Sequence, residues 1–297
     1  MESTWREICK KRHCYLWIAP FFVIFAIFSV YPALYGLGIS LTNHDGFGTP
    51  RFIGFENYVN LFSDSLFWKS LGNTVVLWAL IVPARTFLAL ILASVLNSSK
   101  LLGRRVYTIV SLLPYVTAVL VVANVFRMLL ATQGGIINVI LSSFGIGPVG
   151  WLDTTQMSKI SVAVMNIWRM TGYFAIVLLA GMQKISSSVN EAAELDGAGP
   201  FRKFRSITIP LMGPEIFFVV LMSSIWVLQN MGDVMVLTKG GPINSSMTLV
   251  YYIYKNAFEF SKMGYASAMS YVLFLLLMII SIFSVKGQYS SSKEDKK

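Results

Sequence analysis

Six apolar segments, each about twenty residues or longer, constrain this chain more than any other feature of its sequence. A helix rises about 1.5 Å per residue, so each segment can cross a hydrocarbon core about 30 Å thick. Such a helix satisfies its own backbone hydrogen bonds, which lipid cannot do. The sequence therefore predicts an all-α integral membrane protein with six transmembrane helices. The expected spans are approximately Cys14–Ile39, Gly72–Leu96, Arg105–Leu130, Lys159–Met182, Leu211–Val236 and Tyr265–Val285.

Charged residues are few and strongly biased to one sign. Only 13% of the 297 residues are charged, and the formal net charge is +10. A soluble domain has about twice that charged fraction, and a soluble protein with such a positive excess would suggest a nucleic-acid partner. Here the basic residues gather in short segments between the apolar ones. Orientation in a membrane explains them, and no nucleic-acid partner is expected.

The distribution of lysine and arginine predicts which loops face the cytoplasm. Fifteen basic residues fall in the two termini and in the second-to-third and fourth-to-fifth loops, and five fall in the other loops. The positive-inside rule then places both termini in the cytoplasm. The expected organisation is a cytoplasmic segment 1–13, a first transmembrane helix 14–39, an extracytoplasmic loop 40–71, a core 72–286 with five transmembrane helices and a cytoplasmic loop at 185–210, and a cytoplasmic tail 287–297.

The loop between the fourth and fifth apolar segments has a distinctive local chemistry. Ser187 or Ser188 can cap a short helix. Gly197 and Gly199 permit a turn that a residue with a Cβ would resist, and Pro200 suits the first turn of a second short helix. An ordinary polar loop with two helical turns accounts for these residues equally well.

The order of residues in this loop favours a more specific interpretation. The run Glu191-Ala192-Ala193, followed by Gly197 and by Ile209-Pro210, resembles the EAA loop of binding-protein-dependent ABC importer permeases. The resemblance covers most of the chain and points to the sugar branch of that family, which includes MalF-type maltose, raffinose and melibiose permease subunits. Further matching segments are 54–58, 168–173, 180–183, 238–242, 248–254 and 264–268.

The resemblance implies a role for the cytoplasmic loop. In such importers the EAA loop forms a coupling helix, which sits in a cleft of an ATPase subunit and transmits its closure to the spans. A carboxylate in this helix would meet basic or amide groups of the ATPase. The implied coupling residues are Glu191, Ala192, Ala193, Asp196 and Gly197.

The resemblance also implies an assembly. The chain would have the type I ABC importer permease fold, cross the lipid of a bacterial cytoplasmic (inner) membrane several times, and form a heterodimer with a second related permease subunit. Two cytoplasmic ATPase subunits would bind ATP and Mg, and an extracytoplasmic solute-binding protein would deliver the sugar substrate. The chain has no Gly-x-x-x-x-Gly-Lys-Ser/Thr phosphate loop. We therefore expect a transport subunit that is not an enzyme and holds no cofactor of its own.

Polar side chains inside the fourth and fifth spans suggest a substrate path. Ionisable groups in spans are costly and usually face a cavity, and on each span three of the residues fall three and four positions apart, on one helix face. The alternative is that these residues hold helices together. Arg85 and Arg127 are expected to pair within the bundle or to reach the membrane surface. The path candidates are Asn166, Trp168, Arg169, Tyr173, Trp226, Gln229, Asn230 and Asp233.

Other classes of protein remain as alternatives. A secondary carrier would show matching halves, and a membrane enzyme would need a nucleophile–base pair or a metal cluster. The sequence shows neither, so no catalytic and no metal-binding residues are expected. An ABC permease for glycerol phosphate or an anionic saccharide stays open because Arg169 is basic. Phe47, Phe52 and Phe55 in the long loop after the first span are expected to be available for contact with the solute-binding protein.

Overall fold

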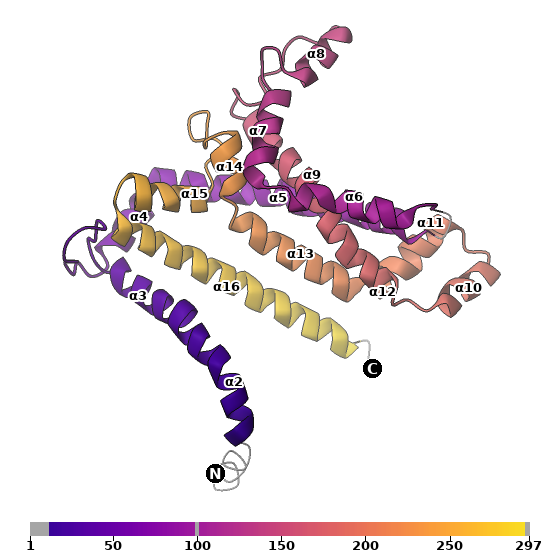
Figure 1. The fold of residues 1–297 in the computed structure, drawn as a ribbon, viewed down its shortest axis with the longest axis horizontal. Helices are drawn as coiled ribbons and strands as arrows, with labels where there is room; N and C mark the ends of the chain where they lie inside the picture. The colour runs from indigo at the N-terminus through magenta and orange to yellow at the C-terminus, as the bar shows by residue number, and fades with distance from the viewer. Residues whose placement is uncertain (1–11, 99–100, 295–297) are drawn as a thin grey trace. The chain divides into compact units, whose positions relative to one another are not determined.

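Helices account for nearly all regular structure in the computed structural model, which describes residues 12–98 and 101–294 (Figure 1). The described residues before 64 form one compact unit with residues 253–274, and the described residues of 64–252 and 275–294 form the other. The expected cytoplasmic segment 1–13 lies almost wholly outside the described residues, as does the end of the expected tail 287–297. The described part of that tail continues the last helix as far as Glu294.

The larger unit is built around α9 (Met157–Met182), which packs against α5 (Ser65–Asn97), α13 (Gly213–Leu228) and α6 (Arg104–Val116). The small side chains of α5 face the large apolar side chains of α9, so the two helices share one buried core. The other helices of this unit are α7 (Val119–Leu129), α8 (Ile136–Ser143), α10 (Ser187–Leu195), α11 (Pro200–Lys203), α12 (Ile209–Leu211), α14 (Gly232–Leu237) and the start of α15 (Leu249–Tyr254), with a π-helical turn at Phe204–Thr208.

A glycine allows α6 and α9 to pack in close contact. A Cβ placed on Gly172 of α9 would lie 1.7 Å from the carbonyl oxygen of Ser111 in α6. No side chain fits at that distance, so only glycine permits this backbone approach. Small residues at helix crossings are typical of membrane bundles, where close packing replaces the hydrophobic drive between helices.

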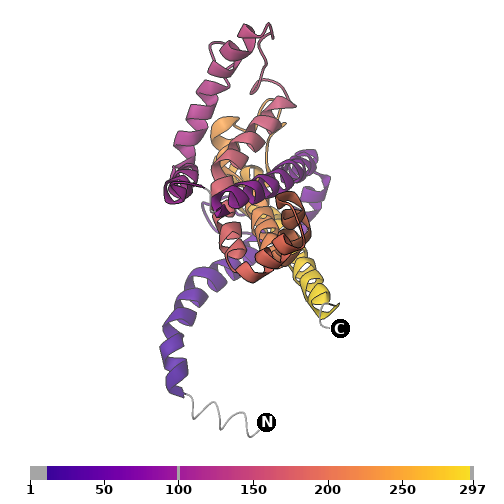
Figure 2. The ribbon, with the colours of Figure 1, turned by 90° about the vertical axis from the view of Figure 1, so that its right-hand side faces the viewer.

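Two of the expected spans are not continuous helices. α6 and α7 meet at 91°, a bend visible in Figure 2, and the two residues at the break, Thr117 and Ala118, are extended. Pro114 lacks an N–H donor, and α6 ends two residues after it. The expected fifth span, 211–236, is also interrupted, because α13 ends at Leu228 and α14 begins at Gly232.

The smaller unit contains α2 (Arg12–Phe25), a π-helical turn (Ala26–Val30), α3 (Tyr31–Ser40), α4 (Glu56–Ser63), a second π-helical turn (Lys255–Glu259) and the first part of α16 (Met263–Glu294). The loop after α3 packs against the start of α16. The Gly264 N–H donates to the carbonyl of His44 at 2.9 Å, and a Cβ on Gly264 would lie 2.0 Å from the Thr42 oxygen. This glycine therefore permits the close contact between the loop and α16.

Within residues 12–98 and 101–294, four helices are long and apolar enough to cross a membrane: Trp17–Ser40, Ser65–Asn97, Met157–Met182 and Met263–Ile282. The number rises to six if each of two bent pairs forms one span, namely α6 with α7 and residues 200–211 with α13. The all-α, multi-span architecture predicted from the sequence is confirmed. The two bent pairs contain sharp breaks, of 91° between α6 and α7 and of 72° between residues 200–211 and α13.

Candidate functional site

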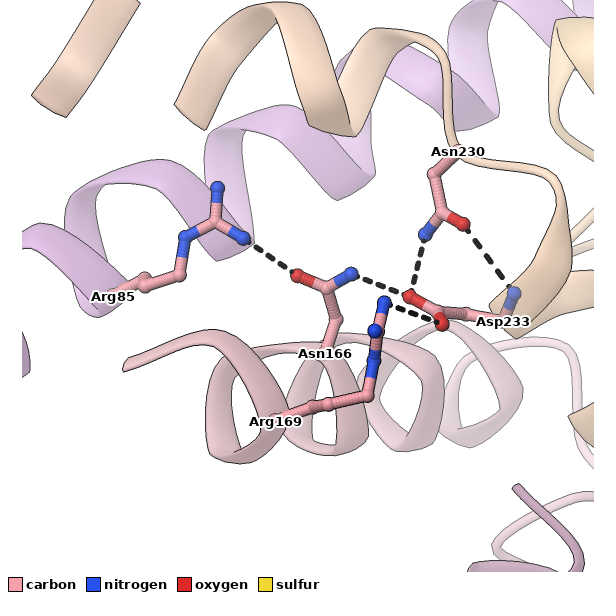
Figure 3. A network of polar contacts seen from close by, with 5 residues as sticks. All are labelled: Arg85, Asn166, Arg169, Asn230 and Asp233. Carbon is pink, nitrogen blue, oxygen red and sulfur yellow. Dashed lines mark hydrogen bonds and ion pairs between the residues drawn. The ribbon is translucent and has the colours of Figure 1, made fainter. Parts of the chain in front are cut away.

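A polar cavity lies where α5, α9 and the break between α13 and α14 meet, and its volume is about 280 Å³. A volume near 300 Å³ is at the small end of the range for small-molecule pockets. The chain break supplies Asn230 and Asp233, α9 supplies Asn166 and Arg169, and α5 supplies Arg85 (Figure 3). The interruption of the fifth span therefore brings backbone and polar side chains into the interior of the bundle.

Asp233 is the centre of a hydrogen-bond network in this cavity. Its carboxylate is fully buried and accepts hydrogen bonds from Asn166 and, at 2.9 Å, from Asn230. It also forms an ion pair with Arg169, with 3.3 Å between Nη2 and Oδ1. Asp233 lies in the first turn of α14, where the helix dipole favours a negative charge. Each interaction stabilises the ionised carboxylate in a place where an unpaired one would be costly.

Arg85 extends the network toward α13. Its guanidinium is fully buried, donates from Nη1 to the Asn166 side-chain oxygen at 2.9 Å, and donates to the side chain and the carbonyl of Ser223. Its Cζ also lies 4.7 Å from the centre of the Phe174 ring, a cation–π distance. The expectation that Arg85 pairs within the bundle is confirmed. Arg85 is not among the path residues predicted from the sequence, although an arginine in the middle of an apolar segment is a signal of such a role.

The charged side chains around the cavity do not balance. Arg85 and Arg169 are positive, and Asp233 is the one carboxylate among the lining residues. Arg169 is only partly buried and uses Nη2 for Asp233, while its buried Nε has no hydrogen-bond partner among the residues described. The cavity wall thus carries an excess positive charge and one N–H donor, Arg169 Nε, that has no partner among the residues described.

The structure brings together six of the eight predicted path residues. Asn166, Arg169, Trp226, Gln229, Asn230 and Asp233 all line the cavity.

Tyr173 and Trp168 lie elsewhere. Tyr173 is stacked between Tyr115 and Trp226, with ring centroids 4.7 Å and 5.3 Å away, so it supports a lining residue rather than lining the cavity. Trp168 is half-exposed, packs on Phe126, and lines a separate apolar groove between α5, α6 and α9.

The cytoplasmic-loop candidates form a short capped helix, α10. Ser186 caps it by accepting from the Ser188 N–H, one residue before the predicted caps. Gly197 follows the helix with φ +73°. The Ala198 N–H donates to the Ala193 carbonyl at 2.9 Å and closes the helix end. The predicted turn at Gly197 is therefore present, whereas Gly199 keeps a negative φ.

Side chains of this loop divide into buried and exposed sets. Ala193 is buried, while Glu191, Ala192, Asp196 and Gly197 are exposed. Leu195, at 90% exposure, is the most prominent apolar side chain of α10. α10 is tied to α11 by an ion pair between Glu194 and Lys203 at 2.6 Å, and the hydrogen bond from Lys203 lowers the pKa of the Glu194 carboxyl.

Among the described residues, no group of three or more His, Cys, Asp or Glu side chains could hold a metal ion. The site is therefore best described as a hydrogen-bonding cavity within a membrane bundle, accompanied by a short helix outside the spans.

This class of structure matches a known family. The chain belongs to the binding-protein-dependent transport system inner membrane components, whose family model matches residues 85–290. The resemblance seen in the sequence is thus confirmed.

Individual relatives cover essentially the whole chain. It is 35% identical to the lactose transport system permease protein LacF of Rhizobium radiobacter, over 100% of both chains. It is 31% identical to the sn-glycerol-3-phosphate transport system permease protein UgpA of Salmonella choleraesuis, over 98% of both. The chain has the same fold as a subunit of the bacterial alginate ABC transporter, which was solved in complex with an alginate pentasaccharide-bound periplasmic protein. The TM-score is 0.81 and the sequence identity is 23%, and the match covers 94% of this chain and 95% of the transporter subunit.

Proposed function

We propose that this chain is the permease subunit of an ATP-binding-cassette importer, and that it moves a carbohydrate through the cavity around Asp233. The observation that carries the proposal is the buried polar network at the break between α13 and α14. Its amides, carboxylate and guanidinium offer both donors and acceptors to hydroxyl groups. Trp226 adds an aromatic surface on the cavity wall. The full-length similarity to a lactose permease supports a sugar as the substrate class.

The same proposal includes the partners. A solute-binding protein delivers the sugar, a second related permease subunit completes the pathway as a heterodimer, and two cytoplasmic ATPase subunits bind ATP and Mg. The alginate transporter supports delivery by a solute-binding protein, because it was solved with its periplasmic protein. In this arrangement both termini and the loop at 185–210 lie in the cytoplasm, and α10 is the coupling helix.

The exposed side chains of α10 suggest how it would engage an ATPase. Leu195 presents an apolar side chain to solvent, and a partner that covered it would gain the free energy of removing that surface from water. Glu191, Ala192, Asp196 and Gly197 are exposed beside it. The Ala193 side chain is buried, so it would pack within the loop and would not contact the ATPase directly.

A second candidate substrate is an anionic solute, such as a glycerol phosphate or an acidic saccharide. The excess of Arg85 and Arg169 over Asp233 favours it, since an anionic group would balance the cavity charge. The similarity to a glycerol-phosphate permease supports this candidate.

The experiment is ATP-driven uptake into liposomes that contain the complete importer, assembled from the subunits and binding protein encoded beside this chain. Matched substrates separate the two candidates: lactose against lactobionate, and glycerol against sn-glycerol 3-phosphate. Trp226→Ala should reduce uptake because this side chain lines the cavity, whereas Trp168→Ala should leave uptake unchanged. Equal uptake by both variants would remove the cavity from the pathway. Uptake of the charged member of a pair without its neutral counterpart would refute the neutral sugar, and the reverse would refute the anionic solute.

A further inference from the structure

The short helix α4 (Glu56–Ser63) has three distinct faces. Asn57 and Leu61, four residues apart, are buried within the smaller unit. Glu56, Asn60 and Ser63 form an exposed polar face.

The third face is exposed and apolar. Val59 and Phe62 of α4, and Phe55 directly before it, follow the i, i+4 and i+7 spacing of one helix stripe, and Phe55, Val59 and Phe62 are 72%, 64% and 57% exposed. We call these three residues the apolar stripe. The helix thus shows two chemically opposite faces to its surroundings at the same time.

α4 is held at the end of a spanning helix. The Asn57 side chain donates to the backbone carbonyls of Ser40 and Thr42, both at 2.8 Å, and the Tyr58 hydroxyl lies 2.8 Å from the Ser40 hydroxyl. Ser40 is the last residue of α3, where the candidate span Trp17–Ser40 ends. These contacts fix α4 where that span ends.

The chain also returns to the membrane directly after α4. Only Asp64 separates Ser63 from Ser65, the first residue of α5. Both ends of the segment are therefore tied to membrane-crossing helices, and α4 cannot move far from the membrane surface.

An exposed apolar stripe beside an exposed polar face is the pattern of a helix at the boundary between water and lipid. Aromatic side chains are enriched at that depth, and the stripe contains two phenylalanines and no charge. Exposed apolar residues of α3 in the same unit, such as Leu34 and Tyr35, have the exposure expected of side chains that face lipid. We propose that α4 is an interfacial anchor, whose apolar stripe lies among the lipid headgroups and upper acyl chains while Glu56, Asn60 and Ser63 face water.

As part of the stripe, Phe55 contacts lipid, whereas the sequence predicts that Phe55 is available for contact with the solute-binding protein. Lipid surrounds the stripe whether or not a binding protein is present. A protein contact would instead leave the stripe in water whenever that partner is absent. The two occupants are therefore separable in a sample that contains no binding protein.

The test is a spin-label measurement of depth. In the full chain with Cys9 and Cys14 replaced by serine, Val59→Cys and, separately, Asn60→Cys are labelled with a nitroxide, and the chain with its accompanying subunits is reconstituted into phosphatidylethanolamine–phosphatidylglycerol liposomes. Both native side chains are exposed, so both labels are tolerated sterically. Collision rates with oxygen, which concentrates in lipid, and with a water-soluble nickel chelate are then measured at each position.

We expect the oxygen-to-nickel collision ratio at Val59→Cys to be several-fold higher than at Asn60→Cys, which is the matched control one residue away on the polar face. Similar low ratios at both positions would overturn the proposal. If adding the solute-binding protein then protects Val59→Cys from nickel, the stripe is a protein-docking surface instead. Similar high ratios at both positions would also overturn it, since the helix would then be submerged rather than interfacial. None of these outcomes depends on which solute is transported.

Discussion

Replacing Asp233 with leucine tests the network at its centre. The substitution keeps a side chain of similar size but removes the acceptor of the Asn166 and Asn230 amides and the counter-ion of Arg169. Leaving one partner of a buried ion pair uncompensated costs about 3–5 kcal/mol, and each unsatisfied buried amide costs about 1–3 kcal/mol. Because these groups share one network, the costs do not add fully. We expect Asp233→Leu to lower the free energy of unfolding by about 4 kcal/mol, within the range for a broken buried pair.

A double-mutant cycle with Arg169 separates the ion pair from the rest of the network. Asp233→Asn keeps one acceptor oxygen, so its cost should be about 1–3 kcal/mol. Combining it with Arg169→Gln removes both charges, and the double variant should be more stable than the sum of the single effects predicts, by about 0.5–3 kcal/mol. The four proteins of the cycle are the parent, the two single variants and the double variant. The free energy of unfolding of each is measured by raising the SDS fraction in mixed micelles and following tryptophan fluorescence.

Two results would refute this reasoning. If Asp233→Leu unfolds within about 1 kcal/mol of the parent, the carboxylate does not hold the network that surrounds it. If the cycle gives no coupling, Arg169 and Asp233 are not paired. In uptake assays Asp233→Asn should retain more activity than Asp233→Leu, because the amide still accepts a hydrogen bond.

Two further predictions follow from helix contacts outside the network. Gly172→Ala should force α6 and α9 apart and reduce the free energy of unfolding by about 1–3 kcal/mol or more. In the same SDS titration the control Gly72→Ala should be neutral, because a Cβ there meets nothing within 4 Å. Equal effects of the two substitutions would contradict the close approach of α6 and α9. Leu195→Cys should crosslink to an ATPase subunit in the assembled importer. Ala193→Cys should crosslink far less, because the Ala193 side chain is buried. The reverse order would place the other face of α10 against the ATPase.

Long uninterrupted apolar runs made parts of the fold predictable from sequence. The expected spans 72–96 and 159–182 lie inside α5 and α9, because both segments combine high hydropathy with enough length to cross a membrane. The bend between α6 and α7 was not predicted, since apolar residues flank Thr117 on both sides and hydropathy carries no information on direction. Pro114 was the one local signal of that break.

The cavity was predictable in part for a similar reason. Helical spacing placed Asn166 and Arg169 on one face of the fourth span, and the structure brings both to Asp233. The same spacing placed Tyr173 on that face, but Tyr115 from α6 stacks against it. Periodicity identifies the face of a helix that points inward, whereas the identity of the neighbouring helix depends on how the bundle packs.

The buried position of Arg85 also has a consequence for how this protein is made. Its hydrogen-bond partners, Asn166 and Ser223, follow it by 81 and 138 residues, so neither exists when α5 leaves the ribosome. A guanidinium at the centre of an inserting helix costs about 2.5–3.5 kcal/mol on insertion scales. The apolar side chains of α5, whose mean hydropathy is 2.3, must therefore offset this cost until α9 and α13 have been synthesised. The high hydropathy of α5 thus serves the period of biogenesis in which Arg85 has none of its final partners.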